Sequence, residues 1–242
     1  MTTALLTAVG VLSLASFVQG LAGFGFGLVA MAILPSLVGM GEAQAVVTVA
    51  GMTATLTRTF ISLPDVQWSS VGRLWVGAAI GVPLGFSLLT AADPALVMRT
   101  LGAAICAMVL FEIFVARRRG LSLPTWTGWG VGLMSGALSG AFNVGGPPLV
   151  AYIYDRPWTK EQQVATLNGI FIGAGSIRLG MLIWHDQLHS GTLMSAAWAA
   201  APMAAAIAFG NWLLSYVPQQ RLRNAIYLVL LLLGVRYLIF GG

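Results

Sequence analysis

The sequence predicts an all-α, polytopic integral membrane protein built from two inverted-topology repeats. Of its 242 residues, 58% are hydrophobic and only 8% are charged, whereas a soluble domain carries about 25% charged residues. Apolar runs long enough to cross a bilayer recur along the chain. Two glycine-rich interruptions lie at corresponding places, since Gly20 matches Gly140 and Gly25 matches Gly145 at one offset. Each repeat is therefore expected to hold a broken helix or re-entrant region and three long transmembrane helices.

The first repeat, residues 1–120, begins with an apolar region that contains the first interruption. Residues 4–40 are too long for one straight crossing, which takes about 20 residues, and the run from Gly20 to Gly27 interrupts them. We therefore expect this region either to cross twice or to enter and leave on one side. Three long helices are expected to follow, at residues 43–62, 71–90 and 95–116.

The second interruption is the stronger of the two because it combines two glycines with two prolines. The sequence Gly145-Gly146-Pro147-Pro148 cannot continue a helix, since proline lacks the amide donor and restricts the residue before it. Proline is well suited to the first turn of a new helix. We therefore expect a break at residues 143–146 and a fresh helix from Pro147, with Asn143 capping or lining its start.

The second repeat, residues 121–242, follows the order of the first within a single transmembrane domain. Its broken region covers residues 126–154, and its three long helices are expected at residues 161–184, 192–215 and 219–240. Other residues recur in the same order in both halves, which supports an internal duplication. These matches pair Glu42 and Gln44 with Glu161 and Gln163, Arg58 with Arg178, Pro83 with Pro202, and Pro94 and Arg99 with Pro218 and Arg223.

Basic residues favour one orientation in the membrane. If each broken region returns to its own side or crosses twice, most basic loops fall on one face, and only Arg99 and Arg236 fall on the other. The positive-inside rule makes the richer face cytoplasmic. Both termini are then outside, the two halves are inverted, and the chain is a multi-pass protein of a bacterial inner membrane, surrounded by lipid. The loops of the basic face contain Arg73, Arg117–Arg119, Arg156, Lys160, Arg221 and Arg223.

The two breaks predict a site for a small anion. Irregular backbone at membrane depth is tolerated only where protein or a water-filled cavity satisfies its polar groups. Amides near Gly25 and Gly145 lie at helix N-termini, where the dipole is positive and glycine allows close approach. Inverted repeats bring both termini near the midplane, with Gln19, Ser139 and Asn143 as side-chain donors. The residues expected to bind the anion are Gln19, Gly23, Gly25, Gly27, Ser139, Asn143, Gly145, Gly146 and Pro147.

A few polar residues in the helices are candidates for a gate or a pathway. Arg58 and Arg178 each lie near a helix end, so snorkelling to the interface and a role in an anion pathway or gate both fit. Asn168 and Thr48 fit either a cavity lining or hydrogen bonding between helices. Glu112 is the candidate for proton coupling, with an interfacial ion pair as the alternative.

No catalytic or cofactor motif is present in the sequence. There is no HExxH, no GxSxG, no pair of membrane aspartates and no nucleotide loop, and the glycines from Gly23 to Gly27 follow no strand. His185 and His189 flank Asp186 in a short loop, which is weak evidence for a metal. The net charge of +5 is small and its arginines lie mainly in loops. We therefore expect no enzyme activity, cofactor, metal or nucleic-acid partner.

The two glycine motifs resemble those of the TauE/SafE family of sulfite exporter-like permeases. The run Gly20-Leu21-Ala22-Gly23-Phe24-Gly25, the run Gly140 to Pro148, and the size and duplication carry this resemblance, which covers nearly the whole chain. It implies secondary transport, in the direction of export, of small sulfur-containing anions such as sulfite, sulfoacetate or other organosulfonates. Alternating access would be driven by proton coupling or by the gradient. An anion channel and an uptake permease for organic anions are the alternatives, and the sequence leaves the oligomeric state open.

Overall fold

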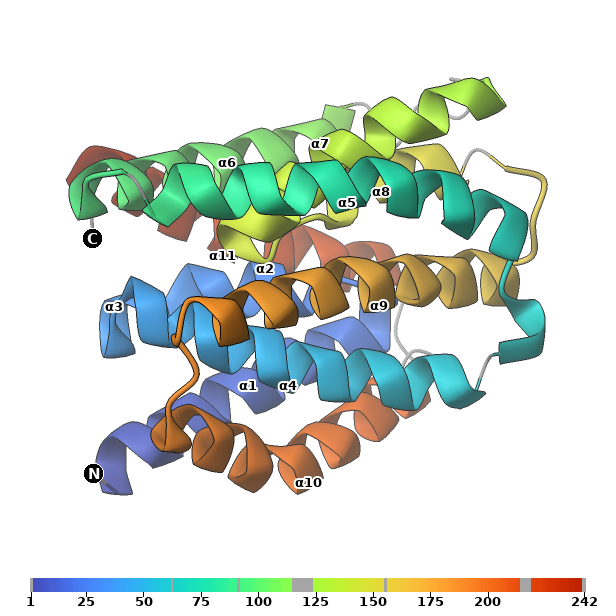
Figure 1. The fold of residues 1–242 in the computed structure, drawn as a ribbon. Helices are drawn as coiled ribbons and strands as arrows, with labels where there is room; N and C mark the ends of the chain where they lie inside the picture. Colours follow the sequence, from blue (N-terminus) through green and yellow to red (C-terminus); the bar gives the residue numbers. More distant parts are fainter. Residues whose placement is uncertain are drawn as a thin grey trace.

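The structure is a computed structural model that describes residues 2–61, 63–90, 92–114, 124–154, 156–213 and 219–240. Within these ranges every regular element is a helix and no strand occurs, which confirms the predicted all-α class. Figure 1 shows most of the helices running side by side along one common direction. The basic run Arg117–Arg119 lies outside the described residues.

The first interruption divides the opening apolar region into three helices, α1 (Thr2–Ala22), α2 (Phe26–Ile33) and α3 (Pro35–Val38). Gly23 and Gly25 lie between α1 and α2 with φ angles of 81° and 102°. Glycine adopts these angles without the steric penalty that a Cβ brings, so the chain reverses here. The remaining elements of this half are α4 (Met40–Ile61), η1 (Leu63–Asp65), α5 (Trp68–Thr90) and α6 (Pro94–Phe114).

The second interruption separates α7 (Gly128–Phe142) from α8 (Gly146–Tyr154). The new helix therefore starts at Gly146 rather than at the predicted Pro147, within the usual uncertainty of helix boundaries. The six predicted long helices are all present, and their ends shift by only a few residues. The remaining elements of this half are η2 (Thr125–Thr127), α9 (Lys160–Trp184), α10 (Ser190–Leu213) and α11 (Gln219–Phe240).

Both broken regions fold back on themselves. In Figure 1, α1 begins and α3 lies at one end of the bundle, whereas α7 begins and α8 ends at the opposite end. Each broken region thus enters and leaves the bundle at one end, which fits both predicted alternatives, a double crossing and a re-entrant region. The start of α1 and the end of α11 lie at the same end of the bundle.

The two halves pack together through five main helix pairs, α1 with α10, α5 with α7, α6 with α11, α5 with α9, and α4 with α9. The α5–α7 pair is held close by glycines on both helices. A Cβ at Gly81 would collide with the carbonyl oxygen of Leu133 and lie 2.8 Å from the amide nitrogen of Ala137. Small residues at helical spacing allow such close approach between membrane helices. The glycines of this seam are Gly77, Gly81 and Gly85 on α5, and Gly132, Gly136 and Gly140 on α7.

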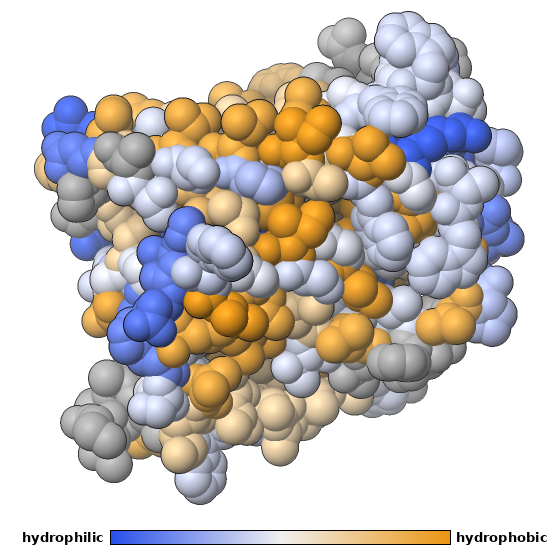
Figure 2. All heavy atoms as spheres, in the orientation of Figure 1, coloured by the Kyte–Doolittle hydropathy of each residue, from blue (hydrophilic) through white to orange (hydrophobic). Residues whose placement is uncertain are grey.

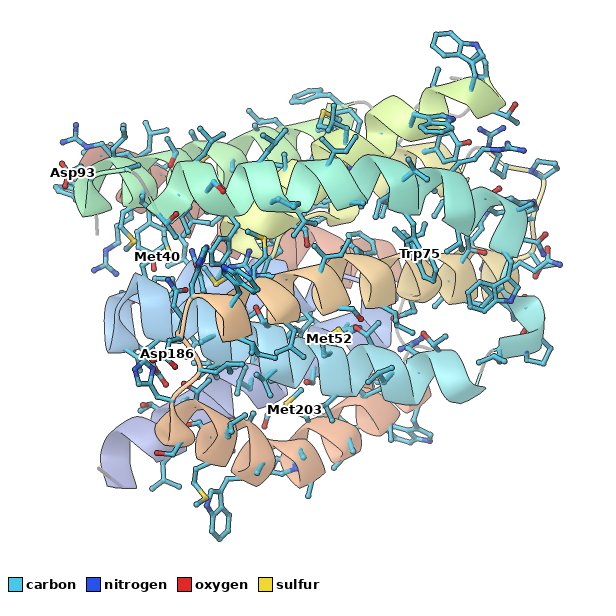
Figure 3. The ribbon with its side chains drawn as sticks, viewed as in Figure 1. Met40, Met52, Trp75, Asp93, Asp186 and Met203 are labelled. Atoms are coloured by element: carbon cyan, nitrogen blue, oxygen red, sulfur yellow. The ribbon has the colours of Figure 1, made fainter. Side chains whose placement is uncertain are left out.

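The outer surface is apolar between two more polar ends. Figure 2 shows hydrophobic residues across the middle of one face and the most hydrophilic residues toward its two ends. Asp93 and Asp186 both lie at one of these ends (Figure 3). Among the described residues, α5, α9 and α10 are long and apolar enough to cross a membrane, and shorter apolar stretches occur in α1, α2–α3, α6 and α11. This surface fits a membrane protein.

Candidate functional site

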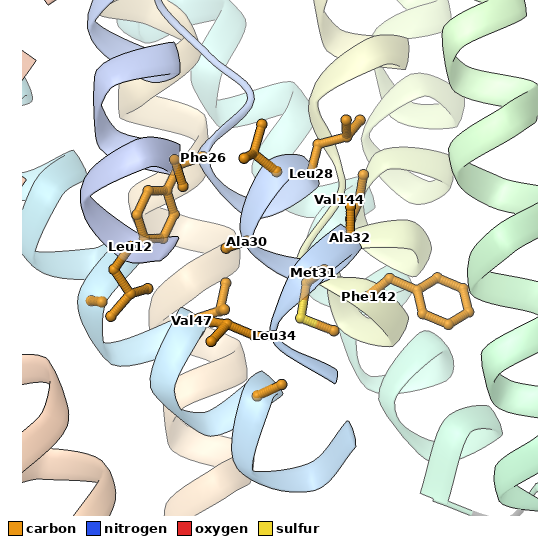
Figure 4. Packing of buried hydrophobic residues seen from close by; sticks show 14 of the residues in the cluster. Leu12, Phe26, Leu28, Ala30, Met31, Ala32, Leu34, Val47, Phe142 and Val144 are labelled. Carbon is orange, nitrogen blue, oxygen red and sulfur yellow. The ribbon is translucent and has the colours of Figure 1, made fainter. Parts of the chain in front are cut away.

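The two helix breaks meet inside the bundle. Gly27, in the first turn of α2, packs directly on the second break, because a Cβ there would overlap the carbonyl oxygen of Asn143. A Cβ at Gly146, at the start of α8, would lie 3.3 Å from the ring of Phe24 in the first break. Figure 4 shows Leu28 of α2 beside Val144. The structure thus brings the two predicted breaks into contact.

A cavity of about 90 Å³ lies where the breaks meet, several times the space that one water molecule requires. It is lined by both breaks together with α4 and α9. Every residue of the predicted binding set lines it except Gly23, which instead faces the side chain of Val164. The lining residues are Gln19, Phe24, Gly25, Phe26, Gly27, Leu28, Val47, Thr48, Gly51, Met52, Thr55, Ser139, Asn143, Val144, Gly145, Gly146, Pro147, Phe171 and Gly175.

Helices α4 and α9 supply lining residues that the sequence reasoning did not single out. Gly51 and Thr55 lie one turn apart on α4, and Phe171 and Gly175 lie one turn apart on α9. The offset that relates the two glycine motifs also relates Gly51 to Phe171 and Thr55 to Gly175. Thr48, which was considered for the lining, does line the cavity.

Asn143 ends α7 rather than starting α8. Its φ of 58° and ψ of 23° place it in the left-handed region, which asparagine tolerates better than most residues. Its amide donates to the carbonyl of Ser139 at 2.9 Å, and the amide of Val144 donates to Leu138 at 3.4 Å. This is a C-terminal cap of the left-handed kind, so the predicted capping of the new helix by Asn143 is wrong. The other predicted role fits the structure, because Asn143 lines the cavity beside the start of α8.

The side chain of Asn143 is anchored to α4. Its Nδ2 donates to the carbonyl of Gln44 at 3.2 Å and to Oγ1 of Thr48 at 3.1 Å. The Thr48 hydroxyl donates to Gln44 O at 2.7 Å and accepts from Arg178 Nε at 2.9 Å, while Gln44 Nε2 donates to Ala141 O at 3.1 Å. Both amide hydrogens of Asn143 are therefore used within the protein. The expected role of Asn143 as a donor to the anion does not hold in this conformation.

Arg178 is fully buried and binds the end of α7. Its side chain is 0% exposed, and its Nη1 donates to the carbonyls of Ser139, at 2.5 Å, and Gly140. A cation is favourable at a helix C-terminus, and Arg178 does not snorkel to the interface. Arg58 lies at the equivalent place in the first half, where its Nη1 donates to the carbonyl of Gln19 at 3.4 Å near the end of α1. The two arginines thus bind the carbonyl ends of the two broken helices.

Two further polar residues lie close to the breaks. Asn168 is fully buried on α9, where its Nδ2 donates to Val164 O at 2.8 Å and its Oδ1 has no hydrogen-bond partner. It does not line the cavity, so its pathway role stays a prediction. Ser135 was not predicted, but its hydroxyl donates to the carbonyl of Gly145 at 2.6 Å, which supports the second break from α7.

The surroundings of the cavity are neutral or positive. None of the described residues that line it is an aspartate, glutamate, histidine or lysine, and the N-termini of α2 and α8 meet there. Because Pro147 and Pro148 lack amides, the first turn of α8 offers fewer donors than that of α2. Within the described part of the chain, no group of three or more His, Cys, Asp or Glu is placed to hold a metal. His185 instead stacks on Phe86, with ring centroids 5.3 Å apart. The backbone donors and the lack of negative charge among the described lining residues suit a small anion.

A bundle of apolar helices around a small internal cavity, with two interrupted helices meeting at that cavity, is typical of a membrane transport protein. The family model for sulfite exporter TauE/SafE matches residues 7–237, and the chain belongs to this family. The probable sulfite/organosulfonate exporter TauE of Cupriavidus necator (strain ATCC 17699) is 26% identical over 207 residues, covering 81% of this chain and 78% of that protein. The probable inner membrane transporter protein TsaS of Comamonas testosteroni is 23% identical over 183 residues, covering 75% and 77%. No solved structure gives a significant match.

Proposed function

We propose that this protein is a secondary transporter that exports small sulfur-containing anions such as sulfite, sulfoacetate or other organosulfonates. The observation that carries the proposal is the cavity where the two breaks meet, which has helix N-termini on its wall and no acidic side chain. The family and the names of the two relatives supply the sulfur chemistry. In this scheme the anion is held near the membrane midplane, largely by backbone amides, and alternating access moves it across.

The halves 1–120 and 121–242 form inverted repeats in this proposal, and the helix contacts support it. The packing of α1 on α10 has its counterpart in α7 on α5, that of α4 on α10 in α9 on α5, and that of α2 on α11 in α8 on α6. Gly20 packs against Ile207 as Gly140 packs against Val82. The first half starts at one end of the bundle and the second at the other (Figure 1).

The cavity itself follows the same symmetry. Most of its lining consists of residues at equivalent positions in the two halves, so that both halves form the site. Rocking of one half against the other would then open the cavity to each side in turn. The equivalent lining pairs are Gln19 and Ser139, Phe24 and Val144, Gly25 and Gly145, Phe26 and Gly146, Gly27 and Pro147, Gly51 and Phe171, and Thr55 and Gly175.

The direction of transport follows from the membrane potential. A potential that is negative inside favours the exit of an anion by about 2.3 kcal/mol per charge per 100 mV. Export therefore needs no dedicated coupling ion, although proton coupling would add to it. Uptake of the same anions would need a coupled cation or proton to oppose this potential.

Substrate flux into and out of proteoliposomes tests the proposal. Sulfite and sulfoacetate are expected to be carried with saturation and with counterflow, whereas simple carboxylates and sulfate of similar size serve as comparison substrates. Transport of carboxylates alone would remove the sulfur assignment, and large conductance without counterflow would indicate a channel. Binding of the same compounds to purified protein, followed by thermal shift, separates a failure to bind from a failure to move.

The orientation is tested by reporter fusions at opposite ends of the bundle. A periplasm-active phosphatase fused after Gly242 should be active, and the same enzyme inserted after Pro157, in the basic loop before α9, should be inactive. The physical reason is the concentration of arginine and lysine at the end of the bundle that contains the loop before α9. The reverse result would overturn the predicted orientation, with both termini outside. Equal activity at both sites would contradict three crossings by α9, α10 and α11 between the two fusion points.

A further inference from the structure

Gln19 contributes an unpaired amide oxygen beside the cavity. It lines the cavity from the end of α1, its side chain is 3% exposed, and its Oε1 has no hydrogen-bond partner. A buried acceptor without a partner is unfavourable. A ligand that brings a hydrogen-bond donor would remove this penalty, whereas a ligand made only of acceptors would not.

Asn143 presents a second acceptor to the same cavity. Its Oδ1 lies 3.3 Å from Thr48 Oγ1, but the proton of that hydroxyl is directed to Gln44 O at 2.7 Å. The amide cannot be turned around, because its oxygen would then face the carbonyl of Gln44 in place of Nδ2. The Asn143 oxygen is therefore left without a strong donor. The two amide side chains of the lining thus add acceptors to the amide donors at the helix N-termini.

Among the described residues, no side chain that lines the cavity can exchange a proton with a ligand near neutral pH. Arg58 and Arg178 bind the carbonyls of the lining residues Gln19 and Ser139 and keep the site positive, but arginine stays protonated. Glu42, at the start of α4, accepts a hydrogen bond from Thr192 and does not line the cavity. Helices α1, α2, α7, α8 and α10 contain no Asp, Glu, His, Lys or Arg. None of the other charged side chains that the structure describes on the helices packed around the site lines the cavity, and the side chain of Glu112, the candidate for proton coupling, lies outside the described residues. The remaining charged residues of these helices are Lys160 and Glu161 on α9, Arg73 on α5, Arg99 and Glu112 on α6, and Arg221, Arg223 and Arg236 on α11.

We infer that the cavity selects an oxyanion that has one negative charge and carries its own hydrogen-bond donor, such as hydrogen sulfite. The oxygens of this anion accept from the amides of α2 and α8, and its proton is donated to an amide oxygen of Gln19 or Asn143. This rests on the proposed function and narrows it, because a dianion without a donor, such as sulfoacetate at neutral pH, becomes a weaker substrate than hydrogen sulfite. A proton then crosses with the anion although no side chain of the site titrates. A dianion such as sulfite brings a second charge and no donor, and it is disfavoured.

Ligand binding across neutral pH tests this inference on the unmodified protein in lipid nanodiscs. The apparent affinity for total sulfite is expected to rise as pH falls, by about tenfold per pH unit where the dianion predominates. The affinity for methanesulfonate, a monoanion without a donor, is expected to stay constant over the same range. A ligand can also carry its hydrogen-bond donor as an alcohol hydroxyl. 2-Hydroxyethanesulfonate should therefore bind more tightly than ethanesulfonate at every pH.

The opposite results are distinguishable from a failure of the proposed function. Sulfite affinity that is constant or that rises with pH would overturn the inference while leaving sulfite transport in place. Absence of binding and flux for all of these sulfur anions would overturn the proposed function as well.

A matched pair of glutamine variants locates the acceptor. Gln19→Leu should lower the preference for hydrogen sulfite over methanesulfonate by about tenfold, since it removes the unpaired oxygen. Gln163→Leu is the control. Gln163 Nε2 donates to Trp158 O at a distance of 3.3 Å, and Gln163 is not a lining residue of the cavity. The melting temperature of Gln19→Leu without ligand should be equal to or above that of the parent, which a purely structural glutamine would not show. An unchanged preference in Gln19→Leu would overturn the assignment of Gln19.

Discussion

Replacing Gly27 with alanine should abolish transport and destabilise the protein by about 3 kcal/mol or more. The added methyl group would overlap the carbonyl oxygen of Asn143, which is backbone and is held in place by the cap of α7. The two breaks would have to separate, and the cavity between them would lose its shape. Sulfite flux in proteoliposomes and the melting temperature of the purified protein measure both effects.

Two other glycines serve as comparisons for Gly27. Gly41→Ala should leave transport unchanged and stability equal or slightly higher, because no heavy atom lies within 4 Å of the added Cβ and alanine favours a helix by up to about 1 kcal/mol over glycine. Gly146→Ala should fold, since its Cβ would lie 3.3 Å from the ring of Phe24, which can shift. It should nevertheless weaken binding by narrowing the cavity, and Gly146→Val should abolish transport. Normal transport by Gly27→Ala would contradict the proposal that transport depends on the contact between Gly27 and the second break.

The positions of the helices and of both breaks could be predicted from the sequence because their causes are local. Long apolar runs determine the six long helices, and glycine or proline in such a run interrupts a helix wherever it occurs. The convergence of the breaks followed from the internal duplication. Most of the predicted binding residues accordingly line the cavity.

The directions of the polar side chains could not be predicted, because they depend on partners far away in the sequence. Asn143 is bound by Gln44 and Thr48 on α4, and no spacing within the glycine motif indicates that partner. The burial of Arg178 depends in the same way on carbonyls at the end of α7. From its position near a helix end, Arg178 could equally be expected to snorkel to the interface, because its carbonyl partners lie 39 and 38 residues earlier in the sequence.

The alignment of α5 with α10 could not be found by matching single residues in the sequence. Gly85 packs against Ala137 as Gly210 packs against Phe17, so these two glycines correspond in the proposed repeat. In this alignment Pro83 corresponds to Ala208, whereas the sequence comparison pairs Pro83 with Pro202. Loops of different length in the two halves change the offset between later helices, and only the contacts reveal by how much.

Arg178→Met should lower the affinity for the anion at least tenfold and reduce transport in proportion. The substitution removes a buried positive charge next to lining residues, and a pair of unit charges contributes about 4 kcal/mol at 4 Å for an effective dielectric constant of about 20, whereas about 1.4 kcal/mol already corresponds to tenfold. The loss of folding stability should be smaller than the number of lost hydrogen bonds suggests. The lost hydrogen bonds to Ser139, Gly140 and Thr48 are offset by release from the cost of burying the charge.

Two further variants separate the charge of Arg178 from its geometry. Arg178→Lys keeps the charge, but a single ammonium group cannot reproduce the fork that joins Thr48 to the end of α7, so affinity should largely persist while transport falls. Arg58→Met is the matched control at the equivalent place in the other half, where the arginine is only half-buried and its charge is better screened by solvent. A smaller loss of affinity is expected there. Equal affinity in Arg178→Met and the parent protein, measured by titration with sulfite, would show that the buried charge does not act on the anion. The positive character of the site would then come from the two helix N-termini alone.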